Sequence, residues 1–221
     1  MTTHVTDQIY EAYLAALLAA LLAGDRAGCT TIVQELNTAD IPLKDLYLNL
    51  FQRSLYRTGE LWEHHKVSVS VEHLATAITE RLLTLVEPKL FSGQPRHHSV
   101  IVACVADEYH QLGARMVADI FELHGWRGYF LGANTPVQSL ITMIEQKKPA
   151  LIALSLSIYS NLPALIKALD AVRAKYPDLP ILVGGQAFSW GGIDLLKQYR
   201  NVTYIASIDQ LEQEMEKYRG R

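Results

Sequence analysis

Hydrophobic residues recur every three or four positions through residues 4 to 90, which is the spacing of one face of an α-helix. The pattern is clearest in Tyr10–Leu21 and in Leu74–Leu85. Gly24 followed by Asp25 is typical of a helix end and the N-cap of the next helix, and Pro42 suits the first turn of a third. The first half of the chain therefore predicts four helices with short connections, which favours an antiparallel bundle.

Beyond residue 98, short apolar runs alternate with helix-like segments. The predicted strands are Ser99–Val105, Gly128–Leu131, Leu151–Leu156, Ile181–Val183 and Val202–Ile205. This alternation predicts a five-stranded parallel sheet with helices on both faces, a flavodoxin- or Rossmann-like fold with strand order 2-1-3-4-5. Phe91–His98 is the expected linker, which gives domains at residues 1–92 and 93–221. Thr135 is the expected N-cap of the helix after the second strand.

Composition excludes several classes of protein. Hydrophobic residues make up 49% and charged residues 19%, which is typical of a folded chain, and the net charge of −3 does not favour nucleic acid. Cys29 and Cys104 form no disulfide framework. The start of the chain lacks the basic segment of a secretory signal, and the richest apolar stretch, Tyr13–Ala23, is too short to span a bilayer. A cytoplasmic location is expected.

Chemistry-bearing residues follow three of the predicted strands. His110 comes just after the first strand, at the point where the strand order switches; Ser155 ends the third strand, and Gly184-Gly185 ends the fourth. These residues should meet at one edge of the sheet, where the glycines would let a ligand approach the backbone. Neutral imidazole is a common metal ligand, and Glu108, together with the neighbouring Asp107, could orient its ring. Alone, His110 is also typical of a residue that caps a helix.

The spacing of these residues resembles the cobalamin-binding signature of methionine synthase and its relatives, Asp-x-His-x-x-Gly followed by Ser-x-Leu and Gly-Gly. Here 41 residues separate Gly113 from Ser155, and 26 separate Ser157 from Gly184. Glu108 replaces the usual Asp, as is common in the light-sensing branch, and Ser157 replaces the usual Leu. The resemblance implies base-off cobalamin with His110 as the lower cobalt ligand. It also implies that the dimethylbenzimidazole tail passes Ser155, Gly184 and Gly185.

The helical half carries a second constellation, in which Trp62 is followed after nine residues by Glu72-His73. In a bundle that precedes a cobalamin domain, this pattern resembles the cap of CarH-type cobalamin photoreceptors. The resemblance covers nearly the whole chain, with a cap at 1–92 and a cobalamin domain at 93–221. It implies that Trp62 shields a light-labile bond on the upper face of the cofactor. His73, held by Glu72, could then become the upper ligand after light. Taken singly, Trp62 is also typical of a core residue, and Glu72-His73 of a solvated helix face.

The resemblance predicts a light-sensing regulatory protein that is not an enzyme and that binds adenosylcobalamin, with methyl- or hydroxocobalamin as alternatives. CarH-type repressors carry an N-terminal domain of the MerR kind, whereas this chain begins directly with the bundle and has no basic cluster there. We therefore expect no direct contact with nucleic acid or membrane, and a separate transcription factor or other protein as the partner. Self-association is compatible with the apolar surfaces of such a cap. The alternatives are a corrinoid carrier for methyl transfer, and a passive cobalamin binder or mutase subunit.

Overall fold

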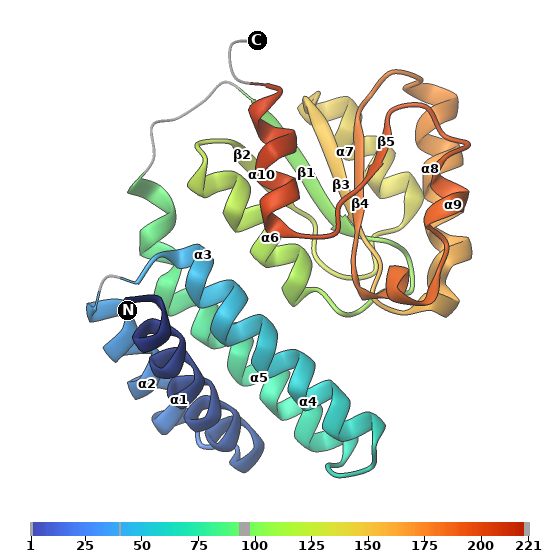
Figure 1. Ribbon diagram of the computed structural model, residues 1–221. Helices are drawn as coiled ribbons and strands as arrows, with labels where there is room; N and C mark the ends of the chain where they lie inside the picture. Colours follow the sequence, from blue (N-terminus) through green and yellow to red (C-terminus); the bar gives the residue numbers. More distant parts are fainter. Residues whose placement is uncertain (1, 40, 93–97, 219–221) are drawn as a thin grey trace. The chain divides into compact units, whose positions relative to one another are not determined.

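Two units make up the chain, Met1–Ser92 and Gly93–Arg221. The computed structural model describes residues 2–39, 41–92 and 98–218 (Figure 1). In the first unit, the helical elements are α1 (Thr2–Ala23), α2 (Arg26–Thr38), α3 (Leu43–Asp45), the π-helical segment η1 (Leu46–Gln52), α4 (Arg53–Glu63), α5 (Val69–Val86) and the 3-10 segment η2 (Glu87–Ser92). Since α3, η1 and α4 follow one another without a break, the unit is a bundle of four helices, as predicted.

Local chemistry sets the helix ends of this unit. Gly24 adopts the left-handed conformation (φ +69°) that ends α1, and the Asp25 side chain then accepts the N–H of Gly28 at 2.9 Å. Ser68 caps α5 in the same way, accepting the N–H of Val71 at 3.3 Å. Apolar faces of α1, α2, η1 and α5 are buried against each other, with Leu17 among their most buried side chains. The bundle therefore has a hydrophobic core of its own.

The second unit alternates strands and helices. Its elements are β1 (Ser99–Cys104), α6 (Leu112–Leu123), β2 (Arg127–Phe130), α7 (Val137–Lys147), β3 (Leu151–Ser155), η3 (Tyr159–Asn161), α8 (Leu162–Lys175), β4 (Ile181–Gly184), η4 (Gln186–Trp190), α9 (Ile193–Leu196), β5 (Val202–Tyr204) and α10 (Ile208–Glu216). All strand pairs are parallel, in the order β2-β1-β3-β4-β5. The predicted fold and strand order are confirmed.

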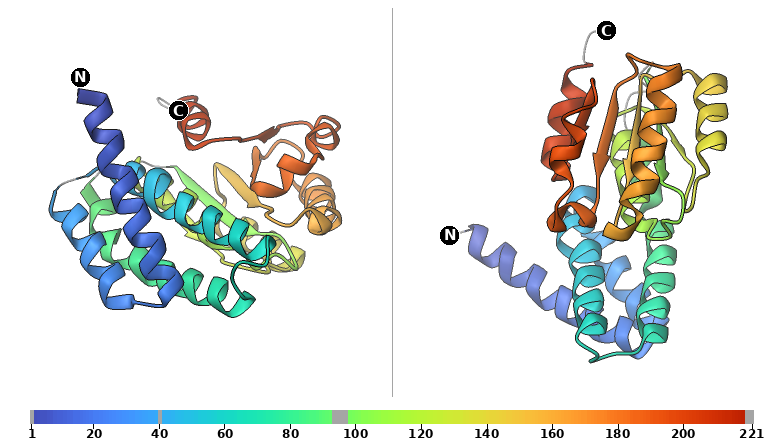
Figure 2. Two further views of the ribbon diagram at one scale, coloured as in Figure 1. Left: turned by 60° about the horizontal axis from the view of Figure 1, so that its bottom comes forward. Right: turned by 90° about the vertical axis from the view of Figure 1, so that its right-hand side faces the viewer.

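Helices cover both faces of this sheet. In the right-hand view of Figure 2, the sheet lies between α10 on one side and α7 and α8 on the other. The face toward α7 and α8 is a continuous apolar core that includes Ile101, Ile152 and Leu165. Because both faces are covered, the strands are almost entirely apolar, and chemistry is left to the loops at their ends.

One predicted helix start is wrong. The N-cap of α7 is Pro136, and the helix begins at Val137, so Thr135 is not the cap. The N–H of Thr135 donates to the carbonyl of Cys104 at 3.1 Å, which holds this residue against the end of β1. The helix starts two residues beyond Thr135.

The apolar stretch Tyr13–Ala23 is explained by the structure of the helical unit. Among the residues that the structure describes, no helix has the length and apolarity needed to cross a bilayer. The apolar stretch Tyr13–Ala23 lies within α1, where Leu17 and Leu21 are buried in the core of the bundle. Its hydrophobicity is therefore explained by packing within the helical unit.

Candidate functional site

His110 and Glu108 form a close pair after β1. The Oε1 atom of Glu108 lies 2.6 Å from Nδ1 of His110 and also accepts the backbone N–H of His110 at 3.0 Å. A carboxylate can only accept, so Nδ1 carries the proton, and in the neutral ring Nε2 carries the lone pair that a metal requires. The Glu108 side chain is fully buried, whereas that of His110 is 57% exposed. The pair therefore presents an oriented imidazole at the surface.

The second carboxylate oxygen of Glu108 reaches another loop. Its Oε2 accepts the backbone N–H groups of Ser157 at 2.8 Å and Ile158 at 2.9 Å. Burial raises the pKa of Glu108, but the hydrogen bonds from His110, Ile158 and Ser157 outweigh burial and lower the pKa to about 2. Glu108 is therefore ionised at neutral pH, and it ties the turn after β1 to the loop after β3.

Two asparagines that sequence reasoning did not single out hold the turn before His110. Asp107 has a left-handed backbone (φ +64°), and its N–H donates to Oδ1 of Asn134 at 2.8 Å. The Nδ2 group of Asn161 donates to the carbonyl of Asp107 at 2.9 Å. The sequence predicted that Asp107 and Glu108 would both orient the His110 ring. In the structure Glu108 contacts the ring, and the backbone of Asp107 anchors the turn.

Ser155 lies at the predicted edge of the sheet, in register with Cys104 on β1 and Gly184 on β4. Burial and the nearby Glu108 carboxylate raise the pKa of the Cys104 thiol to about 12, against a hydrogen bond from the Ser155 side chain that lowers it. The Cys104 thiol therefore stays protonated and unreactive at neutral pH. Ser155 supplies a hydroxyl group between the ends of two other strands.

The glycines of the motif differ in what surrounds them. A Cβ on Gly185, where φ is +120°, would lie 2.1 Å from the carbonyl oxygen of Leu156, and a Cβ on Gly184 would lie 3.1 Å from the carbonyl oxygen of Ile205. The packing of the backbone itself therefore requires glycine at Gly185, a reason that the sequence did not reveal. A Cβ on Gly113 would meet nothing within 4 Å. The space beside Gly113, one turn from His110, is open to a ligand.

Two large apolar side chains near His110 in the chain or in its hydrogen-bond network are exposed. Tyr109 is 66% exposed and Ile158 is 41% exposed, although both are large hydrophobic residues. Exposed apolar side chains beside an oriented imidazole are typical of a binding surface. In the parts of the chain that the structure describes, no three His, Cys, Asp or Glu residues are grouped to hold a metal ion. A single imidazole such as that of His110 therefore suits a metal ion that arrives with other ligands already bound.

In the helical unit, the predicted residues lie at two successive helix ends. Trp62 is in the last turn of α4 and is 47% exposed, so it is not a core residue. His73 is in the first turns of α5, with its side chain 73% exposed, and its Nε2 lies 3.7 Å from Oε2 of Glu72. The other oxygen of Glu72 accepts the hydroxyl of Thr76 at 3.0 Å. These side chains are accessible, and His73 is held far less tightly than His110.

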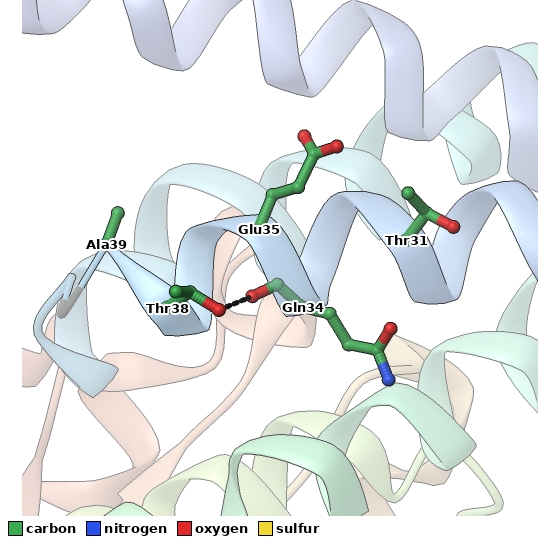
Figure 3. Close-up of a pocket in the computed structure, with 5 residues that line it drawn as sticks. All are labelled: Thr31, Gln34, Glu35, Thr38 and Ala39. Carbon is green, nitrogen blue, oxygen red and sulfur yellow. Dashed lines mark hydrogen bonds between the residues drawn. The ribbon is translucent and has the colours of Figure 1, made fainter.

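A hollow elsewhere on the helical unit is lined by neither histidine nor aromatic side chains. It is lined along α2 and its C-cap by Thr31, Gln34, Glu35, Thr38 and Ala39 (Figure 3). The one hydrogen bond drawn among them runs from the Thr38 hydroxyl to the carbonyl of Gln34, at 2.8 Å. These residues belong to the solvated side of one helix and are all exposed. The edge of the sheet that carries His110 is therefore the stronger candidate site.

Comparison with known proteins relates both units of the chain to B12-binding proteins. Two family models, each described as a B12 binding domain, match residues 98–210 and residues 13–87. The HTH-type transcriptional repressor CarA of Myxococcus xanthus is 32% identical over 122 residues, which cover 54% of this chain and 41% of CarA. The HTH-type transcriptional repressor CarH of the same organism is 27% identical over 179 residues, covering 80% of this chain and 58% of CarH. The chain thus spans about half the length of these curated relatives.

A solved structure shares the fold. The monomethylamine corrinoid protein of Methanosarcina barkeri superposes with a TM-score of 0.79 over 93% of this chain and 98% of its own. The two sequences are only 13% identical, so the likeness concerns the fold and not the chemistry. The match extends over most of both chains.

Proposed function

This chain belongs to the B12-binding domain family, and from that membership we propose that it is a light-sensing regulator that uses bound cobalamin to control a protein partner. The predicted resemblance to CarH-type cobalamin-binding proteins is confirmed by the family matches and by both repressors. Since both relatives are named as transcriptional repressors, we propose a role in transcription regulation rather than in catalysis. Cobalamin is the cofactor that the family implies, and adenosylcobalamin is the form we propose.

The observation that carries the proposal is the Glu108–His110 pair. A buried carboxylate that accepts from Nδ1 fixes both the tautomer and the direction of the ring, as carboxylates do behind metal-bound histidines. We assign His110 as the lower cobalt ligand, with cobalamin in the base-off form. Glu108 acts behind it and stays ionised.

The remaining residues of the sheet edge would hold the displaced tail of the cofactor. Ser155 offers a hydroxyl between the ends of β1 and β4, and the open space at Gly113 admits a ligand close to α6. Ser157 donates its N–H to Glu108, so this residue links the loop after β3 to His110. Gly184 and Gly185 keep side chains away from the end of β4. On this proposal residues 93–221 form the cobalamin-binding domain.

Residues of the helical unit would serve the upper face, and residues 1–92 would act as a cap. Bound alkylcobalamin supplies a carbon–cobalt bond that visible light breaks. Trp62 offers an exposed apolar ring that can exclude water from such a bond. His73, exposed and held by Glu72 at 3.7 Å only, is able to turn toward a vacated ligand position. The resulting change in helix contacts would alter binding to a separate transcription factor.

The deciding experiment is the absorption spectrum of the purified protein with adenosylcobalamin, recorded in the dark and after green light. We expect a spectrum without benzimidazole ligation in the dark and a stable change after light. His110→Ala should lose the dark spectrum, whereas His73→Ala should keep it and lose the stable light product. His64→Ala is the matched control, because His64 is also exposed but its Nδ1 lies 2.7 Å from the carbonyl of Glu60 in its own helix.

Two outcomes would overturn the proposal. An unchanged dark spectrum in His110→Ala would remove the ligand assignment. A light response in His73→Ala equal to that of wild type and His64→Ala would remove the switch. A protein that shows no light response but delivers a methyl group from methylcobalamin to a methyltransferase would be a corrinoid carrier instead.

A further inference from the structure

The turn that carries His110 is held from the side by the loop between β2 and α7, and the geometry points to Asn134 as the residue that positions His110 for its ligand. This inference rests on the proposed function, because it takes His110 as the cobalt ligand. Asn134 lies outside the motif that identified the site, 24 residues beyond His110 in the sequence.

Asn134 bonds each of the three residues that precede His110. Its Oδ1 accepts the N–H of Asp107 at 2.8 Å, and its own N–H donates to the carbonyl of Glu108 at 2.8 Å. Its Nδ2 donates to the hydroxyl of Tyr109 at 3.3 Å. One residue therefore fixes the chain on both sides of Glu108, whose carboxylate in turn holds the His110 ring.

The loop is also tied to the residue that follows His110. The side chain of Gln111 accepts the N–H of Ala133 at 3.1 Å. His110 is thus flanked by two ties to the same loop, one through Asn134 and one through Ala133. Movement of either loop alone would break bonds on both sides of His110.

Backbone conformation explains why the residue is an asparagine. Asn134 has φ +46° and Asp107 has φ +64°, and the left-handed region suits Asn and Asp better than other residues with a side chain. The N–H of a left-handed Asp107 needs an acceptor, which Asn134 supplies. One hydrogen bond thereby offsets the cost of the left-handed backbone at both Asp107 and Asn134. The turn keeps a single conformation before any ligand binds.

Asn134 is a positioning residue, since it acts on His110 through the turn. A positioning role differs from a structural one in its readout: loss of Asn134 should change the His110 ring more than the stability of the fold. Asn134→Gly removes the side chain and tolerates a positive φ. Asn134→Asp keeps the acceptor for Asp107 and should behave as the rescue variant. Asn201→Gly is the matched control, because Asn201 also has a positive φ (+55°) and bonds a carbonyl, that of Asp178, at 3.3 Å.

Two measurements test the inference. In the cobalamin-free protein, nitrogen-15 spectra of the histidine rings report the tautomer of His110, and hydroxocobalamin titration reports affinity. We expect Asn134→Gly to lose the single Nδ1–H tautomer and to bind about tenfold more weakly. Asn134→Asp and Asn201→Gly should keep the wild-type ring signal and affinity.

Failure of the inference and failure of the proposed function are distinguishable. An Asn134→Gly protein with the wild-type ring signal and affinity would overturn the positioning role, and so would an equal loss in Asn201→Gly. If hydroxocobalamin bound wild type and His110→Ala with the same spectrum, the ligand assignment would fall. The ring spectra of the cobalamin-free protein would still decide whether Asn134 orients His110.

Discussion

The two units each carry a glutamate beside an exposed histidine, and the two pairs are built in opposite ways. Glu108 is fully buried, approaches His110 to 2.6 Å and accepts four N–H groups. Glu72 is 22% exposed and stays 3.7 Å from His73, which is itself 73% exposed. The Glu108 carboxylate holds the His110 ring in one orientation before a ligand binds. Glu72 does not hold the His73 ring in this way.

This difference suits the two proposed roles. A permanent ligand gains from a ring that is already aimed, because no side-chain entropy is then lost on binding. A ligand that must exchange with light gains from a ring that is free to turn. The contrast between a buried, fully bonded carboxylate and a partly exposed one is therefore expected to appear in stability, in pH dependence and in affinity.

The largest effect is expected at Gly185, on the edge of the sheet that carries the Glu108–His110 pair, because backbone segments pack closely there. Gly185→Ala would place a Cβ 2.1 Å from the carbonyl oxygen of Leu156 on a backbone with φ +120°. The steric clash and the positive φ both destabilise the folded state of the variant. We expect the free energy of unfolding to fall by about 4 kcal/mol. Urea denaturation measures this loss. A stability close to wild type would mean that the edge around Ser155 is not rigidly packed.

The next effect concerns the charge of Glu108. Its pKa is lowered from 4.5 to about 2, so the stabilisation is complete above pH 4.5 and is lost as the pH falls toward 2. That shift corresponds to about 3 kcal/mol. Glu108→Gln should lower stability at pH 7 by a similar amount and flatten the pH profile, as measured by urea denaturation between pH 2 and 7. A variant that keeps the wild-type profile would show that the carboxylate bonds contribute little.

The fold followed from the sequence because its signals are local. Alternation of apolar runs with helical periods located β1 to β5 and placed Ser155 and Gly184 at strand ends. Strand order followed from the general preference of such folds. Helix caps such as Asp25 were also readable from residue type.

The parts of the site that escaped prediction depend on contacts between distant residues. Asn134 and Asn161 bond Asp107 across 27 and 54 positions of the chain, and no residue type predicts such a partner. Gly185 was predicted to make room for a ligand, but its conflict with Leu156 comes from the close approach of two strand ends. The hydroxyl of Thr135, which was expected to cap the helix, instead donates to the carbonyl of Gly132 at 3.5 Å.

A third prediction separates binding from stability. Gly113 lies in α6, and a Cβ there would meet nothing within 4 Å. Gly113→Ala should therefore raise the free energy of unfolding by up to about 1 kcal/mol, because alanine is the better helix former. If the open space receives the cofactor, the same variant should bind cobalamin about tenfold more weakly, as an overpacked contact would. Equal affinity for wild type and variant would place the cofactor elsewhere.

The smallest effect is expected for the Glu72–His73 pair. Glu72→Gln keeps an oxygen that can accept the Thr76 hydroxyl and removes only a charge 3.7 Å from an exposed imidazole. The free energy of unfolding should change by no more than about 0.5 kcal/mol, because exposed ion pairs contribute little. Urea denaturation at pH 7, run beside Glu108→Gln, checks this value. Equal losses in the two variants would show that both carboxylates are structural, and His73 would then lack the freedom to turn that a light-dependent ligand needs.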